Sequence, residues 1–304
     1  MAENTTEKVI QKVLVPVDFS DITEAVVKSA KFIGEKFKPK FYLLHVISPL
    51  VYISMPETMV VDVIDAETIE EIEEIKRKNA ENFLNNLAKE FEGFEVETVI
   101  DIGSPADVIV EKEELYDVDL TILGGHEKGL VERILLGSTS EAVAKHSKRP
   151  VLVIKGHALE KLQKVAIAYD FSEAADKMVE FALKFLKPFG SKVVLIHVEE
   201  EIDIPLLKKL GLNIISQIRE KKSEKLAQLK ERFEQNGISC EVAYIEEREP
   251  AEGILEVINN DGFDMVMLAD RGLSGLKRIL MGSVSLEVLR KSHIPTFIYK
   301  MRKK

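Results

Sequence analysis

Two acidic residues and two glycine-containing segments are the parts of this 304-residue chain that could do chemistry. In the first half, Asp18 follows an apolar run, and Gly124-Gly125-His126-Glu127 precedes Gly137-Ser138. Glycine lets the main chain approach a phosphate closely and aim successive N–H groups at it. A serine at a helix start adds a hydroxyl and the positive end of the helix dipole. The pattern therefore favours a site for an anionic ligand that is built largely from main chain.

The same set of residues occurs a second time. Asp170 repeats Asp18 at an offset of 152 residues, and Ala269-Asp270-Arg271-Gly272 with Gly282-Ser283 repeats the glycine segment at an offset of 145. A repeat this long is a duplicated domain, because solenoid units are roughly 20–50 residues long. We therefore divide the chain into a first domain at residues 1–155, a linker at 156–163 and a second domain at 164–304, with a separate core for each domain.

Each half alternates β-branched runs with amphipathic stretches, which predicts an α/β fold with a parallel sheet covered by helices on both faces. Five strands per half give two tandem doubly wound, Rossmann-like domains. The expected strands are 12–17, 41–46, 94–100, 120–123 and 151–154, then 165–169, 192–198, 239–245, 265–268 and 296–299. The expected helices are 21–36, 66–91, 104–115 and 138–146, then 174–186, 205–235, 251–259 and 283–291. Both aspartates and both glycine segments then fall at carboxyl ends of strands, where such sheets bind ligands.

The long stretch 66–91 is expected to be an amphipathic helix. Its apolar face is formed by Ile69, Ile72, Ile75, Ala80, Phe83, Leu84 and Leu87. Its charged face, which we expect to be solvated, is formed by Glu70, Glu71, Glu73, Glu74, Lys76, Arg77 and Lys78.

Composition excludes several classes of protein. The formal net charge of −10 argues against a broad nucleic-acid surface, which needs a basic stripe. No stretch reaches the roughly 18 apolar residues of a membrane-spanning helix, and the polar start of the chain does not resemble a signal peptide. The single cysteine, Cys240, cannot form an intrachain disulfide. We expect a cytoplasmic protein that binds neither nucleic acid nor membrane.

The glycine segments resemble the Gly-x-x-Gly, nine residues, Gly-Ser/Thr signature of the universal stress protein family. Val15-Pro16-Val17-Asp18-Phe19-Ser20, Leu44-His45-Val46 and Gly103-Ser104-Pro105-Ala106 resemble other landmarks of that family in order. The resemblance covers nearly the whole chain as two tandem domains. It implies a fold like that of the adenine nucleotide alpha hydrolases and a role in stress response.

The resemblance also implies an adenine-nucleotide pocket in each half, holding AMP or ATP. The main chain at Val46 and Val198 would read adenine, and residues 102–103 and 247–248 would flank the base. Asp18 and Asp170 would lie near the ribose or near a magnesium ion bound to the phosphates. The phosphates would be held by the glycine segments and the serines that follow, with the site residues Gly103, Gly124, His126, Gly137, Ser138, Arg271, Gly272, Gly282 and Ser283.

Both copies depart from the family signature. Glu127 occupies the second glycine position of the first half, where a carboxylate beside a phosphate costs roughly 1 kcal/mol even in water. Ala269 replaces the first glycine of the second half, which is tolerable unless the backbone φ there is positive. Arg271 and Lys277 place cations near that second segment. We therefore expect the second half to be the better nucleotide binder, and the first to bind a ligand with fewer phosphates, such as AMP, or none.

No catalytic residue is assigned. The chain has no Walker motif, no nucleophile elbow and no triad. His45 and His197 hold equivalent positions, and we expect them to be structural or to contact the ligand-binding residues without touching the ligand. Ser138 and Glu141 have the spacing of a capping box, which is a purely structural alternative for that helix start.

Three functions stay open at this point. The first is a nucleotide-binding stress-response module whose ligand controls binding of an unknown protein partner. The second is a slow metal-dependent ATP hydrolase or adenylyl-transfer enzyme in which Asp170 holds the metal, and the third is a scaffold whose pockets have decayed. Family habit also suggests that strands 151–154 and 296–299 pair antiparallel in an internal pseudo-dimer. Residues 48–65 are the candidate apolar surface for pairing whole chains as a homodimer.

Overall fold

The computed structural model describes residues 9–49, 66–125, 136–199, 212–246, 248–260, 262–272 and 281–301. Side chains at 66–69 and 212–215 lie outside that description, as does the predicted pairing surface, except for residues 48 and 49. The first half runs β1 (Lys12–Pro16), α1 (Ile22–Phe37), β2 (Lys40–Ile47), α2 (Ala66–Glu90), β3 (Glu95–Ile102), α3 (Pro105–Leu115), β4 (Leu120–Gly124), α4 (Ser138–His146) and β5 (Val151–Ile154).

The second half repeats this order. It runs β6 (Lys164–Ala168), α5 (Glu173–Leu186), the 3-10 helix η1 (Lys187–Phe189), β7 (Lys192–Glu199), α7 (Leu212–Gln235), β8 (Cys240–Glu246), α8 (Pro250–Asn260), β9 (Met265–Ala269), α9 (Ser283–Lys291) and β10 (Thr296–Tyr299). All ten predicted strands and all eight predicted helices are present, with ends that move by one or two residues. The exception is the helix expected at 205–235, whose first seven positions lie outside the described residues.

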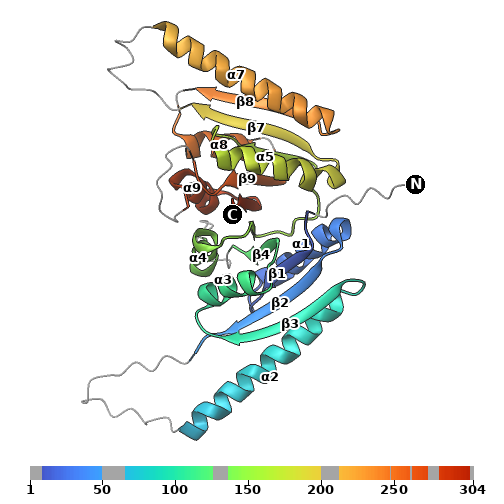
Figure 1. Cartoon of the computed structure of the whole chain (residues 1–304). Helices are drawn as coiled ribbons and strands as arrows, with labels where there is room; N and C mark the ends of the chain where they lie inside the picture. The colour runs from blue at the N-terminus through green and yellow to red at the C-terminus, as the bar shows by residue number, and fades with distance from the viewer. Residues whose placement is uncertain are drawn as a thin grey trace, which may run out of the picture.

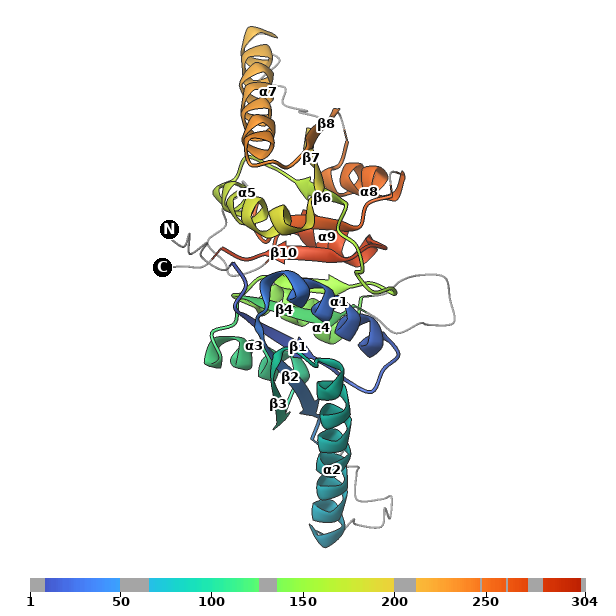
Figure 2. The same ribbon diagram turned by 90° about the vertical axis from the view of Figure 1, so that its right-hand side faces the viewer.

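One ten-stranded sheet runs through both halves in the order β3-β2-β1-β4-β5-β10-β9-β6-β7-β8. Within each half, neighbouring strands are parallel, as predicted. β5 and β10 pair antiparallel, with Leu152 opposite Phe297, which confirms the predicted internal pseudo-dimer. The strands of the two halves therefore point in opposite directions, and their carboxyl ends lie at opposite edges of the sheet. α2 and α7 lie at the two far ends of the elongated molecule (Figures 1 and 2).

The apolar core is divided by the faces of the sheet and not by the halves of the chain. One cluster lies beneath α1, α2, α5 and α7, and the other beneath α3, α4, α8 and α9. Each cluster contains residues of both halves: Phe37 of α1 stacks on Phe185 of α5 with ring centroids 5.5 Å apart. The expectation of two separate cores is therefore wrong, because a continuous sheet presents one surface on each face.

The segment that joins the halves is packed against the domains. Leu159 and Leu162 are buried, and the Leu159 N–H donates to Ser29 Oγ at 2.8 Å. Lys155, which we placed at the polar boundary of the first domain, is only 2% exposed. The predicted linker at 156–163 is therefore packed on the protein and is not a free tether.

Helix α2 follows its predicted amphipathic pattern except at its first turns. Ala80, Leu84 and Leu87 are buried, whereas Ile75 is 59% exposed, against our expectation. A helix of 25 residues is about 37 Å long. The eight-residue strands beneath it span only about 26 Å, so the start of α2 projects beyond the sheet (Figure 1). None of the helices in the described part of the chain is long and apolar enough to cross a membrane.

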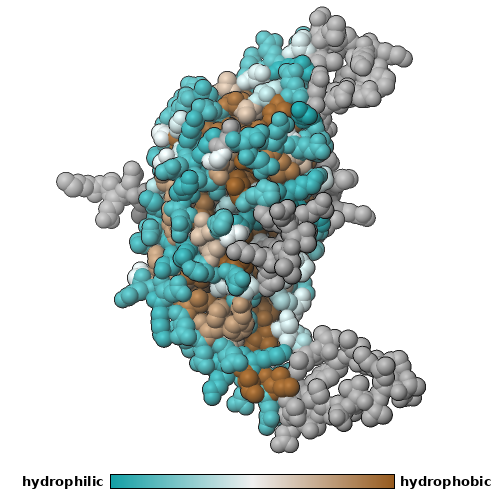
Figure 3. All heavy atoms as spheres, turned by 180° about the vertical axis from the view of Figure 1, so that it is seen from behind, coloured by the Kyte–Doolittle hydropathy of each residue, from teal (hydrophilic) through white to brown (hydrophobic). Residues whose placement is uncertain are grey.

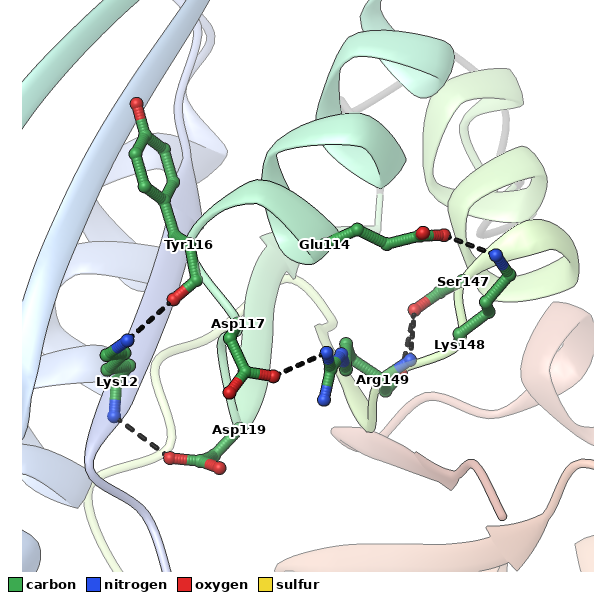
Figure 4. Close-up of polar contacts among 8 residues, drawn as sticks. All are labelled: Lys12, Glu114, Tyr116, Asp117, Asp119, Ser147, Lys148 and Arg149. Carbon is green, nitrogen blue, oxygen red and sulfur yellow. Dashed lines mark hydrogen bonds and ion pairs between the residues drawn. The ribbon is translucent and has the colours of Figure 1, made fainter. Parts of the chain in front are cut away.

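Polar contacts fasten the amino edge of the sheet, away from the predicted site. Asp119 Oδ2 accepts from the main-chain N–H groups of Gln11 and Lys12 at 2.8 and 3.1 Å, and Lys12 Nζ donates to the Tyr116 carbonyl (Figure 4). Asp264 makes the equivalent pair of bonds in the second half, at 2.7 and 2.9 Å. Some residues kept by the duplication therefore hold the fold and do not mark a ligand site.

Candidate functional site

The aspartate after β6 lies directly against the second glycine of the loop after β9. Asp170 Oδ1 accepts from the Ser172 N–H at 3.0 Å and from its hydroxyl at 2.6 Å. The other oxygen, Oδ2, faces Gly272, where an added Cβ would lie only 2.8 Å away. β6 and β9 are parallel neighbours, so their carboxyl ends meet at one edge, and these two predicted site residues come together as expected.

Asp18 has the same local structure in the first half. Its Oδ1 accepts from the N–H and the hydroxyl of Ser20, and its carbonyl accepts from Thr23 Oγ1 at 2.7 Å. One oxygen of each aspartate is thus used to close a turn before a helix, while Asp18 itself is exposed. The second oxygen of each carboxylate takes no part in that turn, and in Asp170 it faces Gly272.

The two helices that begin with serine have starts that no side chain caps. Gly137 and Gly282 are their N-cap residues, and neither helix has a side-chain cap bond. By contrast, the Ala175 N–H in the first turn of α5 donates to Ser172 Oγ at 3.1 Å. The first-turn N–H groups of α4 and α9, together with the exposed Ser138 and Ser283, are therefore oriented to bind an anion.

The loop ends fix these helix starts on the sheet. The Gly137 N–H donates to the Gly125 carbonyl, and the Gly282 N–H donates to the Asp270 carbonyl, both at 2.7 Å. Gly124, the predicted first glycine, lies against α1: an added Cβ would be 2.5 Å from Ile22. The glycine of the first half is therefore required for packing as well as for any ligand.

The alanine at the equivalent position of the second half is accommodated. Ala269 is the last residue of β9 and does not have a positive φ, so the condition that we set for tolerating it is met. The residue equivalent to Ile22 is Ala174, which leaves room for the extra methyl group. The departure from the family signature thus comes with a compensating change in the helix that covers it.

Ser140 and Ser285 are site residues that the sequence reasoning missed. Ser285 Oγ donates to the Ala269 carbonyl at 2.7 Å, and Ser140 Oγ donates to the Gly124 carbonyl. These bonds tie each anion-binding helix to the strand end beside it. The signal was available, because both halves read Gly-Ser-x-Ser. The capping-box alternative is wrong: Glu141 pairs with Lys145 and Arg290 and does not cap α4.

The predicted base-binding residues lie at the ends of neighbouring strands. Val46 of β2 pairs with Asp101 of β3, and the Gly103 N–H donates to the Ile47 carbonyl at 3.1 Å. In the second half, the Arg248 N–H contacts the Glu199 carbonyl at 3.4 Å. The side chains of Val46 and Val198 pack on the face of the sheet that carries α4 and α9. The expected base end and phosphate end of each site therefore lie on one face.

The two equivalent histidines are structural, as expected. His45 Nδ1 lies 2.9 Å from the Val17 carbonyl, and His197 Nδ1 lies 2.9 Å from the Tyr169 carbonyl. A carbonyl only accepts, so Nδ1 carries the proton in both rings. Burial lowers the pKa of His197. Both imidazoles thus brace the β1 and β6 ends that carry the aspartates.

A carboxylate that the sequence analysis did not weigh lies within the second loop. Asp270 is buried, and its Oδ2 lies 3.5 Å from Arg271 Nε and 3.9 Å from Lys300 Nζ. Burial raises the pKa of Asp270, although Lys300 and Arg271 oppose that shift. Half-buried Arg271 is therefore partly neutralised by its neighbour and is a weaker phosphate ligand than its sequence position suggested.

Some predictions lie outside the described residues. These are His126, Glu127, Glu247 and Lys277, so the expected effect of Glu127 on the first site stays a prediction. Within the described residues, no group of three histidine, cysteine, aspartate or glutamate side chains could hold a metal ion. Asp18 and Asp170 would therefore need phosphate oxygens to complete a magnesium site.

Comparisons with known proteins identify the family. The model of the universal stress protein family matches residues 10–155 and again 161–300. Universal stress protein MJ0577 of Methanocaldococcus jannaschii is 37% identical over 153 residues, covering 48% of this chain and 94% of that protein. A universal stress protein of Mycolicibacterium smegmatis is 26% identical over 306 residues, covering 99% of this chain and all of that one.

A solved structure extends the likeness to the complete tandem arrangement. The crystal structure of a universal stress protein from Archaeoglobus fulgidus DSM 4304 has a TM-score of 0.71 and 26% identity, covering 98% of this chain and 100% of that one. Both domains, their order and the fold are thus accounted for, and the chain belongs to the universal stress protein family as a tandem-domain member.

Proposed function

We propose that this chain is an adenine-nucleotide-binding stress-response module in which the second half holds the stronger site. The observation that carries the proposal is the contact between Asp170 and Gly272 beside the uncapped start of α9. A main-chain anion site, a carboxylate for the ribose or a phosphate-bound magnesium, and a strand end for the base then lie on one edge and one face of the sheet. AMP and ATP both fit this chemistry.

The ligand would act by shifting the loop after β9 toward one arrangement. A ligand can shift such an equilibrium only as far as it binds the two states with different affinities. Phosphate contacts to Gly282 and Ser283 would favour one arrangement of the start of α9, and the surface formed there would then be recognised by a protein partner. This proposal assigns no general base, so it predicts binding without turnover.

The test uses the full chain with matched variants at the two helix starts. Ser283→Glu places a carboxylate where the phosphate would bind, and Ser138→Glu makes the same change in the first half. Glutamate is favourable in the first turn of a helix, so neither variant should unfold the protein. We expect isothermal titration calorimetry to show ATP or AMP binding that Ser283→Glu abolishes and Ser138→Glu leaves largely intact.

Thermal unfolding and phosphate release complete the test. Nucleotide at 100 times its dissociation constant should add about 2.7 kcal/mol to the free energy of unfolding. If neither AMP nor ATP binds wild-type protein, the proposal is wrong and the scaffold alternative gains support. Metal-dependent phosphate release that Asp170→Ala abolishes would instead establish the enzyme alternative.

A further inference from the structure

The second half contains a buried carboxylate at the end of β7 that is bound from three sides. Glu199 is only 3% exposed, and it accepts a hydrogen bond from Tyr244 Oη at 2.8 Å. Lys222 Nζ and Arg219 Nε each lie 3.1 Å from its oxygens. Burial alone would raise the pKa of Glu199, but the Tyr244 and Lys222 contacts outweigh it and the pKa is lowered. This end of the second half is therefore a preformed carboxylate-binding site that the Glu199 side chain itself occupies.

The first half lacks both the carboxylate and the tyrosine. Ile47 is equivalent to Glu199. His197 pairs with Tyr244 across the strands, whereas His45 pairs with Ile100, so isoleucine also replaces the tyrosine. The change removes two polar groups from the space between β2 and α2. A cavity of about 620 Å³ opens there instead, lined by Phe19, His45, Ile47, Lys76, Asn79 and Asn82, among others.

The aromatic floor of this space is kept in both halves. Phe19 and His45 meet edge to face at 5.0 Å, and Phe171 and His197 do so at 4.7 Å. Phe19 is nevertheless 63% exposed, whereas Phe171 is half-buried with Lys222 over its ring. Figure 3 shows hydrophobic side chains at several places along the middle of the face seen from behind, including its lower part toward α2. The first half therefore exposes a ring that its counterpart covers.

A lysine of α2 forms part of the cavity wall. Lys76 of α2 is half-buried, and none of the described carboxylates forms an ion pair with it. Asn79 and Asn82 follow on the same helix and add amide donors. A half-buried ammonium facing an aromatic-lined cavity favours a negatively charged ligand with a flat apolar body. The volume is in the range of small-molecule sites, about 300–1,000 Å³.

We propose that the first half binds a small aromatic carboxylate in this cavity, with the ligand's carboxylate taking the place that Glu199 takes in the second half. The ring packs against Phe19, and Lys76 pairs with the carboxylate. The cavity shares Val46 with the expected base end of the nucleotide site, but the groups that this proposal uses, Phe19, Ile47 and Lys76, do not belong to that site. His45 and Ile47 point toward the α2 side, while Val46 between them points toward α3.

The test probes wild-type full-length protein with phenylacetate and with phenylacetamide, which has the same shape without the charge. We expect saturation-transfer NMR and calorimetry to detect phenylacetate with a dissociation constant on the order of 1 mM or tighter. Phenylacetamide should bind at least about tenfold more weakly, since it lacks the charge-assisted contact with Lys76.

Matched variants locate the site. Lys76→Gln should weaken phenylacetate binding by about tenfold or more, while Lys78→Gln, at an exposed position of the same helix that does not line the cavity, should leave it unchanged. Ile47→Glu should abolish binding by supplying the internal carboxylate. Equal binding of the acid and the amide, equal effects of the two lysine variants, or no phenylacetate binding at about 10 mM would each overturn the proposal.

Discussion

Lys155 and Lys300 hold equivalent positions in the two halves, and each donates a hydrogen bond to a helix of the other half. Lys155 Nζ donates to the Leu289 carbonyl of α9 at 2.6 Å, and Lys300 Nζ donates to the Ala144 carbonyl of α4 at 2.5 Å. Both lysines are buried. A cation at a helix carboxyl end is favoured by the helix dipole, so the exchange joins the halves beyond the β5–β10 pairing.

The two lysines should differ in their importance for stability. Lys300 also faces the carboxylates of Asp270 and Glu113, whereas no described carboxylate pairs with Lys155, whose pKa burial lowers to about 8. Lys300→Met leaves the buried Asp270 with Arg271 alone beside it and should cost about 3 kcal/mol or more. Lys155→Met loses one charged hydrogen bond and should cost about 1–2 kcal/mol in urea unfolding at neutral pH.

Lys291→Met is the control for that pair, because Lys291 is exposed on α9 and, among the described residues, forms an ion pair with Glu287 alone. It should change the free energy of unfolding by less than about 0.5 kcal/mol. Equal costs for Lys155→Met and Lys300→Met would contradict the unequal burial of charge described above.

Glu113 should make the protein less stable as the pH rises. Its side chain is fully buried, it accepts from Thr121 Oγ1 and Ser147 Oγ at 2.7 Å each, and burial raises its pKa from 4.5 to about 7 despite those bonds and the nearby charges of Lys300 and Arg149. Between these values the unfolded chain loses its proton and the folded chain keeps it. Stability therefore falls across this window, by up to about 3 kcal/mol in total.

Glu113→Gln keeps the shape and removes the titration. Urea unfolding between about pH 5 and about pH 8 should show a shallower loss of stability in this variant than in the wild type. Glu114→Gln, at an exposed neighbouring position, is the control and should follow the wild-type curve. Parallel curves for all three proteins would show that Glu113 does not hold its proton in the folded state.

The pair formed by Glu141 of α4 and Arg290 of α9 should contribute little, although its geometry is good. Arg290 Nε and Nη2 bind the two carboxylate oxygens at 2.8 and 2.5 Å, and chiefly this contact lowers the Glu141 pKa to about 2. The Arg290 side chain is about half exposed, so water and salt screen the pair. A double-mutant cycle with Glu141→Gln and Arg290→Gln should give a coupling of about 0.5–1 kcal/mol.

The contribution of Glu141 should be complete above about pH 4.5 and should disappear as the pH falls toward 2, since the folded pKa lies below the unfolded one. Repeating the cycle in about 1 M salt should reduce the coupling further. A coupling above about 2 kcal/mol that persists in high salt would mean that the pair is shielded from solvent.

Most of the fold could be predicted from local sequence patterns. The alternation of strands and helices predicted every described strand and α-helix, though not the 3-10 helix η1, and the rule that ligands bind at carboxyl ends of strands predicted that Asp170 and Gly272 lie together. The bonds of Ser140 and Ser285 to strand carbonyls were missed because a serine two residues into a helix has no distinctive sequence pattern. Only comparing the two copies would have marked them.

Contacts between the halves could not be predicted from local patterns. The reciprocal hydrogen bonds of Lys155 and Lys300 require a continuous sheet whose two central strands are antiparallel. Only the family resemblance predicted that pairing. Local patterns also failed to predict the core, which we expected to form a separate cluster in each half of the chain. The cavity beside Phe19 depends on Ile47 and Ile100 replacing a glutamate and a tyrosine on neighbouring strands, and sequence order alone does not show that these positions are adjacent.

Gly272→Ala should weaken nucleotide binding strongly, whereas Ala269→Gly should hardly change it. Gly272→Ala brings a methyl group within 2.8 Å of Asp170 Oδ2 while Ser172 holds the same carboxylate, so the loop must move away from the ligand. Calorimetry with ATP should show a loss of affinity of about tenfold or more, with circular dichroism unchanged. Ala269→Gly restores the family glycine, yet Ala174 already leaves room for the methyl, so affinity should change by less than about twofold. Improved binding by Ala269→Gly, or unchanged binding by Gly272→Ala, would mean that the nucleotide does not rest on this loop.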